Sequence, residues 1–513
     1  MRLSGVDRMI GRMKTTLAHP VSSSSRRLTR ACIVGALVSL TGLVLTDNVA
    51  HATSFVVTTT ADGGLGSLRD AITQANANPG PDTINLPAGT YTLTIAGTNE
   101  NSNATGDLDI TGETTIIGAG SGATIIDANG IDRAIEMHGG PVILQSLTVT
   151  NGSVPGSGGG NLSVHQFVDL TVTDSVISNG FALNGGAIGA DKGITTITRS
   201  EIINNTVDFV PGNGSVGSAI AKGGGDNGTL IIAESLIAGN NAIQGTAAVY
   251  VNANATITNS TFSGNAAQNH TILLETYGNV VLAATLTHVT IANNTTSGSI
   301  LGSGLATNVL APATMSVTVE GSLLQNNLRG VTPSNCAVKA TGAITSGDHN
   351  LSDDTSCTSF TQPSDLNNNQ STTLGALADN GGPTRTLALV AGSSAIDAAG
   401  DCAATTLTDQ RFVSRPKGIA CDIGAFEADA AVNTSTTETP TTATPTTDAP
   451  GSTLVEPPTS LTQTTLPPIV TMPPFYPDQL PVTGSSHSNG LWLAMLACSL
   501  GALLVLTARR RAR

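Results

Sequence analysis

A loose repeat of short β-rich segments is the feature that most constrains the fold of this chain. Each unit has a run of β-branched residues, then a Ser, two or three further apolar residues, and Asn or Asn-Gly. A period of about 25–35 residues without helical periodicity predicts a β-solenoid. The marks of the successive units are 29, 25, 35, 25, 28 and 34 residues apart: Ser146, Ser175, Ser200, Ser235, Ser260, His288 and Ser322.

In such a solenoid, every coil contributes short strands that pair in parallel with the neighbouring coils. Inward Val, Ile and Leu form one core, while Asn or Gly occupies the corners because both tolerate left-handed backbone angles. Stacked Asn side chains can hydrogen-bond along the axis. At about 27 residues per coil, the repeats of residues 113–330 predict about eight coils. The inward column is expected to contain Ile177, Ile203, Ile237 and Ile291.

A transverse β-sandwich is the main alternative fold. It predicts hairpin turns every 8–12 residues, and the repeat does not show them. The fold class is therefore predicted to be all-β, with a parallel β-helix as its main body.

The ends of a solenoid need covers, because an open terminal coil is an unpaired edge. Residues 66–76 predict a short capping helix, with Ser67 as the N-cap. Leu68, Ile72 and Ala75 share one face of this helix. We assign residues 53–112 to this cap and the first coils, and residues 331–429 to a C-terminal cap module.

The segment 430–479 is rich in Thr, Pro and Ser. This composition cannot bury a core, and it predicts a disordered, extended stalk.

The N-terminal residues 1–52 are typical of a secretory signal peptide. A basic stretch precedes the apolar run 31–45, and Ala50-His51-Ala52 has the small-x-small pattern of a cleavage site. The mature chain is expected to begin at Thr53.

Residues 480–513 combine three signals: the sequence LPVTG, an apolar segment at 491–508, and a terminal Arg cluster. The combination resembles the cell-wall sorting signal of Gram-positive surface proteins. That resemblance implies that the Cys of a sortase attacks the carbonyl of Thr483, so that Thr483 becomes covalently linked to peptidoglycan. The alternative is an ordinary transmembrane anchor at 491–508. Both place most of the chain outside the cell. The motif comprises Leu480, Pro481, Val482, Thr483 and Gly484.

The charge of the processed chain excludes some partners. Seven of the 22 Lys and Arg residues lie in 1–52 and four follow Thr483, but only two of the 36 acidic residues lie there. The mature chain therefore has a net charge near −23. Such a surface repels nucleic acid and anionic lipid.

Four cysteines remain after processing: Cys336, Cys357, Cys402 and Cys421. An even number in an exported chain indicates disulfides, with three connectivities available. Pairing of sequence neighbours, Cys336 with Cys357 and Cys402 with Cys421, closes two short loops outside the repeats, each contributing about 3 kcal/mol. A zinc site is the alternative, but neither a CxxC motif nor clustered His supports it.

Several motifs resemble those of exported bacterial β-helix proteins. Residues 66–72 (GSLRDAI) resemble the CSLREAI-type motif, with Gly66 and Asp70 in place of its Cys and Glu. Residues 181–188 (FALNGGAI) resemble the repeats of polymorphic outer-membrane proteins. The C-terminal motifs at 380–384, 394–397, 408–411 and 422–427 resemble a choice-of-anchor module. The resemblance implies a right-handed parallel β-helix displayed on the cell surface, without an established chemistry.

Some parallel β-helices cleave polysaccharides, so we weighed an enzymatic function. Glycoside hydrolysis needs two carboxylates about 5–9.5 Å apart, and clustered carboxylates on the outer face would favour an enzyme. The solenoid acids are spread along the repeats and are interpreted as structural or solvated: Asp127, Asp132, Glu136, Asp169, Asp174, Asp191, Glu201, Asp208, Asp226, Glu234 and Glu275.

The histidines have neither i,i+4 nor HxH spacing, and they are interpreted as scattered: His138, His165, His270, His288 and His349. In the C-terminal module, Asp397, Asp409, Arg411, Asp422 and Glu427 predict either a buried hydrogen-bond network or a ligand site, of which we favour the network.

The sequence thus predicts a sortase-anchored, structural or adhesive cell-wall protein that binds an extracellular glycan or a ligand on a host or partner cell. It indicates neither catalytic residues nor a metal site nor a cofactor. The alternative is a polysaccharide-active or polysaccharide-binding β-helix protein.

Overall fold

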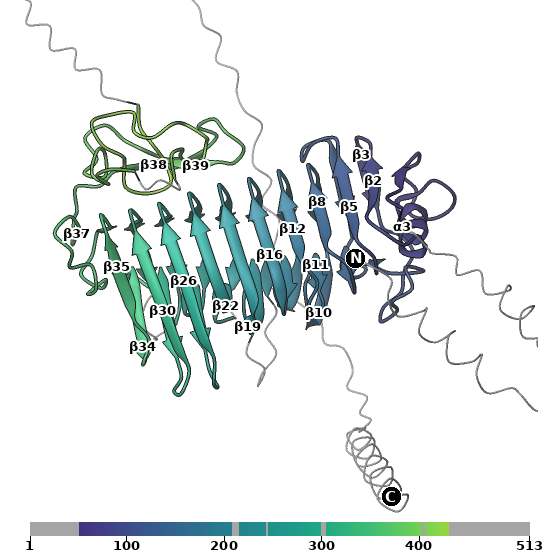
Figure 1. Cartoon of the computed structure of the whole chain (residues 1–513), viewed down its shortest axis with the longest axis horizontal. Helices are drawn as coiled ribbons and strands as arrows, with labels where there is room; N and C mark the ends of the chain where they lie inside the picture. Colours follow the sequence, from purple (N-terminus) through teal and green to yellow (C-terminus); the bar gives the residue numbers. More distant parts are fainter. Residues whose placement is uncertain (1–50, 208–214, 243–244, 299–303, 403–405, 430–513) are drawn as a thin grey trace, which may run out of the picture. The chain divides into compact units, whose positions relative to one another are not determined.

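Short runs of alternating apolar residues form the strands of this molecule. The computed structural model describes residues 51–207, 215–242, 245–298, 304–402 and 406–429. Within them the chain is all-β, apart from helix α3 (Leu68–Ala77), and winds into a parallel β-solenoid of about 10 turns (Figure 1). The predicted parallel solenoid is thereby confirmed. The stalk 430–479 and the segment 480–513 lie outside the described residues, as do residues 1–50 of the predicted signal peptide.

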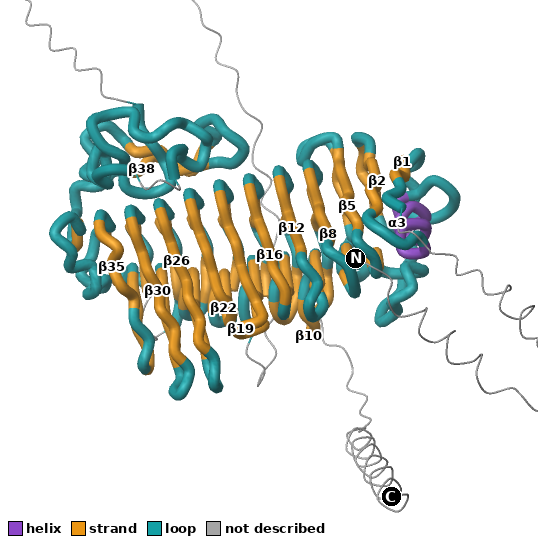
Figure 2. Tube along the Cα trace, viewed as in Figure 1, coloured by secondary structure: helices purple, strands orange, loops and turns teal. Residues whose placement is uncertain are grey.

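Each complete coil passes through four columns of parallel strands, which we name A to D in chain order. Figure 2 shows the strands of successive coils side by side along the stack. Column A contains β4 (Leu108–Ile110), β7 (Ile135–Met137), β11 (Leu162–Val164), β15 (Ile188–Ala190), β25 (His270–Thr276), β29 (Leu305–Val309) and β34 (Cys336–Ala340). Column B contains β2 (Asp82–Leu86), β5 (Thr114–Gly118), β8 (Val142–Gln145), β12 (Leu170–Thr173), β16 (Gly193–Thr198), β26 (Val281–Thr287), β30 (Thr314–Glu320) and β35 (Ile344–Asp348). The long strands β19 (Ile220–Ala233) and β22 (Ala247–Thr258) run through both columns.

The remaining two columns complete each coil. Column C contains β3 (Gly89–Thr92), β6 (Thr124–Asp127), β9 (Thr148–Thr150), β13 (Val176–Ser178), β17 (Glu201–Ile203), β20 (Leu236–Ala238), β23 (Thr261–Ser263), β27 (Thr290–Ala292), β31 (Leu323–Gln325), β36 (Leu351–Ser352) and β37 (Leu366–Asn367). Column D contains β10 (Ser153–Gly158), β14 (Phe181–Asn184), β18 (Thr206–Val207), β21 (Asn241–Ala242), β24 (Ala266–Ala267), β28 (Thr295–Thr296) and β32 (Leu328–Arg329), with β33 (Thr332–Pro333) antiparallel to β32.

The inward positions of column C form the predicted apolar stack, with one correction. Ile177, Ile237 and Ile291 do stack, but Ile202 and not Ile203 lies between Ile177 and Ile237. Ile203 pairs with Ser178 and is only half-buried. A shift of one residue moves a strand side chain to the other face, so two adjacent Ile residues are easily exchanged. The full stack is Tyr91, Ile126, Val149, Ile177, Ile202, Ile237, Phe262, Ile291 and Leu324.

The Ser residues of the repeat form a buried ladder at the corner before column C. The backbone N–H of Ser175 donates to Ser200 Oγ, Ser200 donates to Ser235, and Ser235 donates to Ser260 in the same way. Ser146 and His288 lie one residue away from this register. Both adopt positive φ at the preceding corner position, in line with Asp174, Arg199 and Glu234.

A second ladder of buried Asn side chains runs along the stack, as the sequence predicts. Five of its members precede strands of column D, whereas Asn161 and Asn335 precede β11 and β34 of column A. The Nδ2 group of each Asn except Asn335 donates to Oδ1 of the next Asn of the ladder. In the pairs at 204–205, 293–294 and 326–327, the first Asn adopts left-handed φ and the second is buried, whereas Asn240 is itself buried and follows Gly239 at positive φ. Buried amides are thereby satisfied by their neighbours, which favours an uninterrupted stack. The ladder comprises Asn161, Asn205, Asn240, Asn265, Asn294, Asn327 and Asn335.

Helix α3 lies at the N-terminal end of the stack (Figure 1). The side chain of Ser67 accepts a hydrogen bond from the N–H of Asp70, as expected for an N-cap. Leu68, Ile72 and Ala75 are buried, so the apolar face packs on the first strands, as the sequence predicts.

The first coils lie within 53–112, as expected, but the coils continue beyond the predicted boundary at residue 330. Parallel pairing begins with β1 (Ser54–Val56) on β2, and it continues through β34, β35 and β37. The rest of the predicted C-terminal module forms an antiparallel pair, β38 (Leu374–Ala378) and β39 (Thr386–Leu389), and loops that fold back against column C. Arg385 makes a bidentate contact with Glu201, and the Thr261 hydroxyl donates to Gln410.

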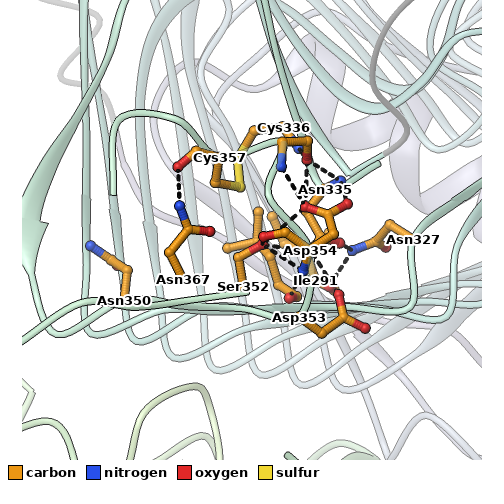
Figure 3. The surroundings of a disulfide bond; sticks show 12 residues. Ile291, Asn327, Asn335, Cys336, Asn350, Ser352, Asp353, Asp354, Cys357 and Asn367 are labelled. Atoms are coloured by element: carbon orange, nitrogen blue, oxygen red, sulfur yellow. Dashed lines mark hydrogen bonds between the residues drawn. A yellow bond between two sulfur atoms is a disulfide. The ribbon is translucent and has the colours of Figure 1, made fainter. Parts of the chain in front are cut away.

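Two disulfides connect the predicted cysteine pairs. The Cα atoms of Cys336 and Cys357 are 4.8 Å apart, and those of Cys402 and Cys421 are 5.6 Å apart. Contrary to the prediction, the first pair does not lie outside the solenoid, because Cys336 pairs with Leu305 in column A. Figure 3 shows this bond beside Asn335, the last member of the Asn ladder. The disulfide therefore fastens the final coil.

Candidate functional site

A groove on the outer face of column A is the candidate functional site. Inward residues such as Ile135 and Leu162 alternate with outward residues that stack across five coils. Most of these outward side chains are small, which leaves a hollow of about 430 Å³. The outward residues that line it, in coil order, are Glu136, Ser163, Gly189, Ala221 and Tyr250.

The two ends of the groove differ in chemistry. At the Tyr250 end, the phenol donates a hydrogen bond to Glu275 Oε2 at 2.8 Å. Burial and the charge of Glu275 raise the pKa of Tyr250, so this phenol stays protonated. The end formed by Glu136 and His165 belongs to a group of charged residues from three coils, which we name the acid–histidine cluster. Its members are Asp107, Asp109, Asp132, Arg133, Glu136, His138 and His165.

Strand register assembles this cluster. Asp109 on β4 and Glu136 on β7 are direct neighbours in column A, and both point outward. His138 and His165 each follow the last residue of their strands, and Met137 pairs with Val164 just before them. Because the coils are stacked at about 4.8 Å, residues far apart in sequence become adjacent.

Glu136 lies between the two imidazoles. His165 Nε2 is 2.9 Å from Glu136 Oε1, and His138 Nε2 is 3.6 Å from Glu136 Oε2. The ring centroids are 4.4 Å apart. His138 Nε2 is also 3.1 Å from Asp109 Oδ1. One ligand atom from each of Glu136, His138 and His165 fits within 4.8 Å of the others, and the same is true of Asp107, Asp109 and Glu136.

Arg133 neutralises part of the negative charge of the cluster. Its Nη1 lies 3.5 Å from Asp107, 3.9 Å from Asp132 and 3.4 Å from Glu136. Burial, reinforced by Asp132, Asp109 and Glu136, raises the pKa of Asp107 to about 7. Burial likewise raises the pKa of Asp109 and of Asp132. Asp107 is therefore partly protonated near neutral pH, which reduces the negative charge that Arg133 has to balance.

The residues of the acid–histidine cluster differ in how far they are exposed to the groove. Asp109 and Asp107 are 0% and 2% exposed, whereas the side chain of His165 is 47% exposed. Glu136, at 8%, is the carboxylate of the cluster that lines the groove. Two carboxylates that act on one glycosidic bond must both reach it. Asp107 and Asp109 are therefore too deeply buried to form such a pair with Glu136, and Asp191 is a second carboxylate that lines the groove.

A second polar group lies in the C-terminal module, at the residues that the sequence singled out. Arg411 pairs with Asp409, and Arg415 Nη1 pairs with Glu427 Oε2 at 2.9 Å in a fully buried contact. Backbone N–H groups also donate to the carboxylates of Asp422 and Glu427. Burial raises the pKa of Asp422 to about 6. These bonds match a buried hydrogen-bond network, the interpretation favoured from the sequence.

Only some of the predicted signal-cleavage and sorting residues lie in the described part of the chain. Ala50 and the motif from Leu480 to Gly484 lie outside the described residues. Ala52 is exposed, and the backbone N–H of Thr53 donates to Asp82 Oδ1 at 3.0 Å. No helix in the described part of the chain is long and apolar enough to cross a membrane, and the segment 491–508 lies outside that part.

The cluster contains residues that sequence reasoning missed. By the usual helical and HxH spacings, His138 and His165 are unrelated, but they are 27 residues apart, which is one coil. Asp107 and Asp109 precede the repeats of residues 113–330, so the repeat pattern does not indicate them. The repeated pattern of three strand residues followed by His, IEMH and LSVH, is the signal that could have revealed the pair.

No family model matches the chain, and neither a curated protein nor a solved structure matches it.

Proposed function

We propose that this chain is an exported cell-wall protein, anchored by sortase, that binds an extended extracellular polymer in the groove of its right-handed β-solenoid. The LPVTG motif, the apolar segment 491–508 and the Arg cluster support the anchoring. Two disulfides support an oxidising, extracellular compartment. In this proposal, the 430–479 stalk carries the solenoid away from the peptidoglycan to which Thr483 is joined.

The groove across several coils is the observation that carries the binding proposal. Its floor repeats at the coil spacing and consists mostly of small side chains, so an extended chain can lie along it without displacing protein atoms. Tyr250 offers an aromatic ring at one end, while Glu136 and His165 offer polar contacts at the other. The negative charge disfavours nucleic acid and favours a neutral or cationic glycan.

Polysaccharide cleavage is the second candidate function. Its support is the carboxylate group of Asp107, Asp109 and Glu136, whose oxygens lie within 4.8 Å of one another. Clustered carboxylates on the outer face are the feature that would favour an enzyme. Burial of Asp107 and Asp109 is the reason for ranking binding first.

Blocking the groove tests the binding proposal. The ectodomain, residues 53–479, is screened on a glycan array, and the strongest ligand is then titrated against Ser163→Trp. We expect at least a tenfold loss of affinity, because the indole fills the groove floor. The matched control is Ser316→Trp, which places the same side chain on an exposed outward position of β30.

Unchanged affinity of Ser163→Trp would refute binding in the groove. Reducing-sugar and unsaturated-product assays run alongside the titration. Product formation that Glu136→Gln abolishes would establish the enzymatic candidate instead.

Cell-wall digests test the anchoring. We expect Thr483→Ala to abolish covalent attachment to peptidoglycan, because the cleavage site of the motif is altered. Thr464→Ala, in the stalk, is the control and should leave attachment intact. Continued covalent attachment of Thr483→Ala would refute this part of the proposal.

A further inference from the structure

Two histidines on successive coils enclose one carboxylate at the open end of the groove. The Nε2 atoms of His138 and His165 approach the two oxygens of Glu136 at 3.6 and 2.9 Å. Neither histidine is needed for the core, because both lie on the outer side of column A. Imidazole nitrogen together with carboxylate oxygen is a donor set that suits divalent transition metals.

The spacing of these atoms is compatible with one shared ion. Zinc binds His nitrogen and carboxylate oxygen at about 2.0–2.2 Å, so its tetrahedral ligand atoms are about 3.4 Å apart. The ligand atoms of Glu136, His138 and His165 lie within 4.8 Å of one another, so small side-chain rotations bring them to an ion. Asp109 Oδ1, 3.1 Å from His138 Nε2, is placed either to orient His138 or to join the ligands.

Asp107 supplies a second, separate observation. Asp107 Oδ2 is buried and has no hydrogen-bond partner within the described residues. Its cationic neighbour is Arg133 Nη1 at 3.5 Å, which two other carboxylates, those of Asp132 and Glu136, also approach. The nearby Arg69 is committed to Asp62 and to the backbone oxygens of Gly106 and Asp107. A buried oxygen without a partner is costly, and a dication beside it would offset that cost.

The neighbouring coils show that the solenoid itself does not require this chemistry. At the position of Glu136, the next three coils have Ser163, Gly189 and Ala221, and their strands pair in the same register. A cluster of His and carboxylate groups on a single pair of coils is therefore a local addition to the repeat.

We propose that Glu136, His138 and His165 bind one divalent transition-metal ion, such as Zn²⁺, at the end of the groove. The exposed side of His165 leaves a coordination position open to the groove, where an oxygen of a bound ligand or water completes the shell. This inference goes beyond the proposed function, because the ion binds whether or not the groove holds a polymer.

Metal titration of the full-length chain tests the proposal without any glycan. The protein is purified in detergent without a polyhistidine tag, stripped with a chelator, and titrated with Zn²⁺ by calorimetry. We expect one strong site per chain, and a loss of affinity of about 100-fold or more in His165→Gln and in His138→Gln. Co²⁺ bound to the wild type should show visible absorption bands that both variants lack.

His349→Gln is the matched control, because His349 lies beside a single carboxylate, Asp348. It should bind Zn²⁺ as the wild type does. Thermal melting of the metal-free proteins separates binding from folding, and His165→Gln should melt like the wild type because this side chain is half exposed. Three results would overturn the proposal: no saturable Zn²⁺ binding to the wild type, unchanged binding in the His138→Gln/His165→Gln double variant, or preferential binding of Ca²⁺.

Discussion

The first and the later coils of the solenoid share an interior but differ on their outer face. From β13 to β31, the corners carry the Ser ladder and most of the Asn ladder, and each rung repeats the last. From β4 to β11, the outward positions of column A carry the acid–histidine cluster. The same coil geometry thus supports a repetitive buried structure and a local concentration of charge.

This difference separates two roles within one repeat. Inward residues are constrained by the coils above and below, because every buried amide or methyl group has a neighbour at the strand spacing. Outward residues on column A meet fewer such constraints, so a change there alters chemistry without altering the stack. The comparison predicts large effects on stability from inward changes and effects on binding from outward changes at the cluster.

The largest expected effect is that of a charge placed in the column C stack. Ile202→Asp puts a carboxylate between Ile177 and Ile237, where it has no partner, and should cost several kcal/mol or prevent folding. Ile203→Asp is the matched control one residue away, and should cost much less because Ile203 is only half-buried. Chemical denaturation of both variants gives the comparison. Equal losses of stability would contradict the observed register.

The disulfides should act on different parts of the later chain. Removing the Cys336–Cys357 bond by Cys336→Ala and Cys357→Ala should cost about 3 kcal/mol and loosen the last coil. Removing the Cys402–Cys421 bond should loosen the C-terminal module at a similar cost. Hydrogen exchange followed by mass spectrometry locates the change. Faster exchange of β34 and β35 in the second variant but not in the first would contradict this assignment.

A single rung of the Asn ladder should have a smaller effect. In Asn240→Ala the neighbouring Asn205 loses an acceptor and Ile202 O loses a donor, so we expect a cost of about 1–3 kcal/mol. Asn227→Ala, which removes an exposed side chain bonded to Asp226, should be near neutral. Thermal melting measures both variants. A neutral Asn240→Ala would show that the ladder does not stabilise the later coils.

The smallest effect near neutral pH concerns His288, at the contact between the later coils and the C-terminal module. Burial, reinforced by the charge of Arg415, lowers the pKa of His288 from 6.5 to about 3. Folding therefore favours the neutral form of His288. The contribution of His288 to the free energy of unfolding is complete above pH 6.5. It is lost as the pH falls towards 3, by up to about 1.4 kcal/mol per pH unit.

Replacing His288 by Asn, which also tolerates its positive φ, should remove this part of the acid sensitivity. Asp422 works in the opposite direction, because its raised pKa makes folding favour the protonated form below about pH 6. Asp422 contributes equally in the wild type and in His288→Asn. The difference between their free energies of unfolding therefore isolates the effect of His288. Parallel stability curves for the two between pH 6.5 and 4 would contradict the assignment.

The parts of the fold that the sequence predicts are those in which each coil repeats the previous one. The Asn pairs indicate both the corner and the inward amide, and the short spacing between cysteines indicates the pairing. Register within a coil is harder, because Ile202 and Ile203 have the same chemistry and only their neighbours distinguish them. The boundary at residue 330 was placed too early because the last coils no longer carry the Ser mark, with Asn350 in its place.

The candidate site is less visible in the sequence than the fold. His138 and His165 become neighbours only after the coil period is applied to them, and His-x-His spacing is the wrong pattern for a solenoid. Asp107 and Asp109 belong to the first coils, where loops of different length conceal the repeat. Their depth below the surface depends on how α3 and the following loop pack, which local sequence does not determine.

The separation of interior stability from outer-face function is tested most directly by one paired measurement on full-length protein. Zn²⁺ affinity and metal-free melting temperature are determined for His138→Gln/His165→Gln and for Asn240→Ala. We predict that the first variant loses Zn²⁺ binding and keeps its melting temperature, while the second keeps Zn²⁺ binding and melts earlier. A double-histidine variant that melts early, or that binds Zn²⁺ like the wild type, would contradict the account.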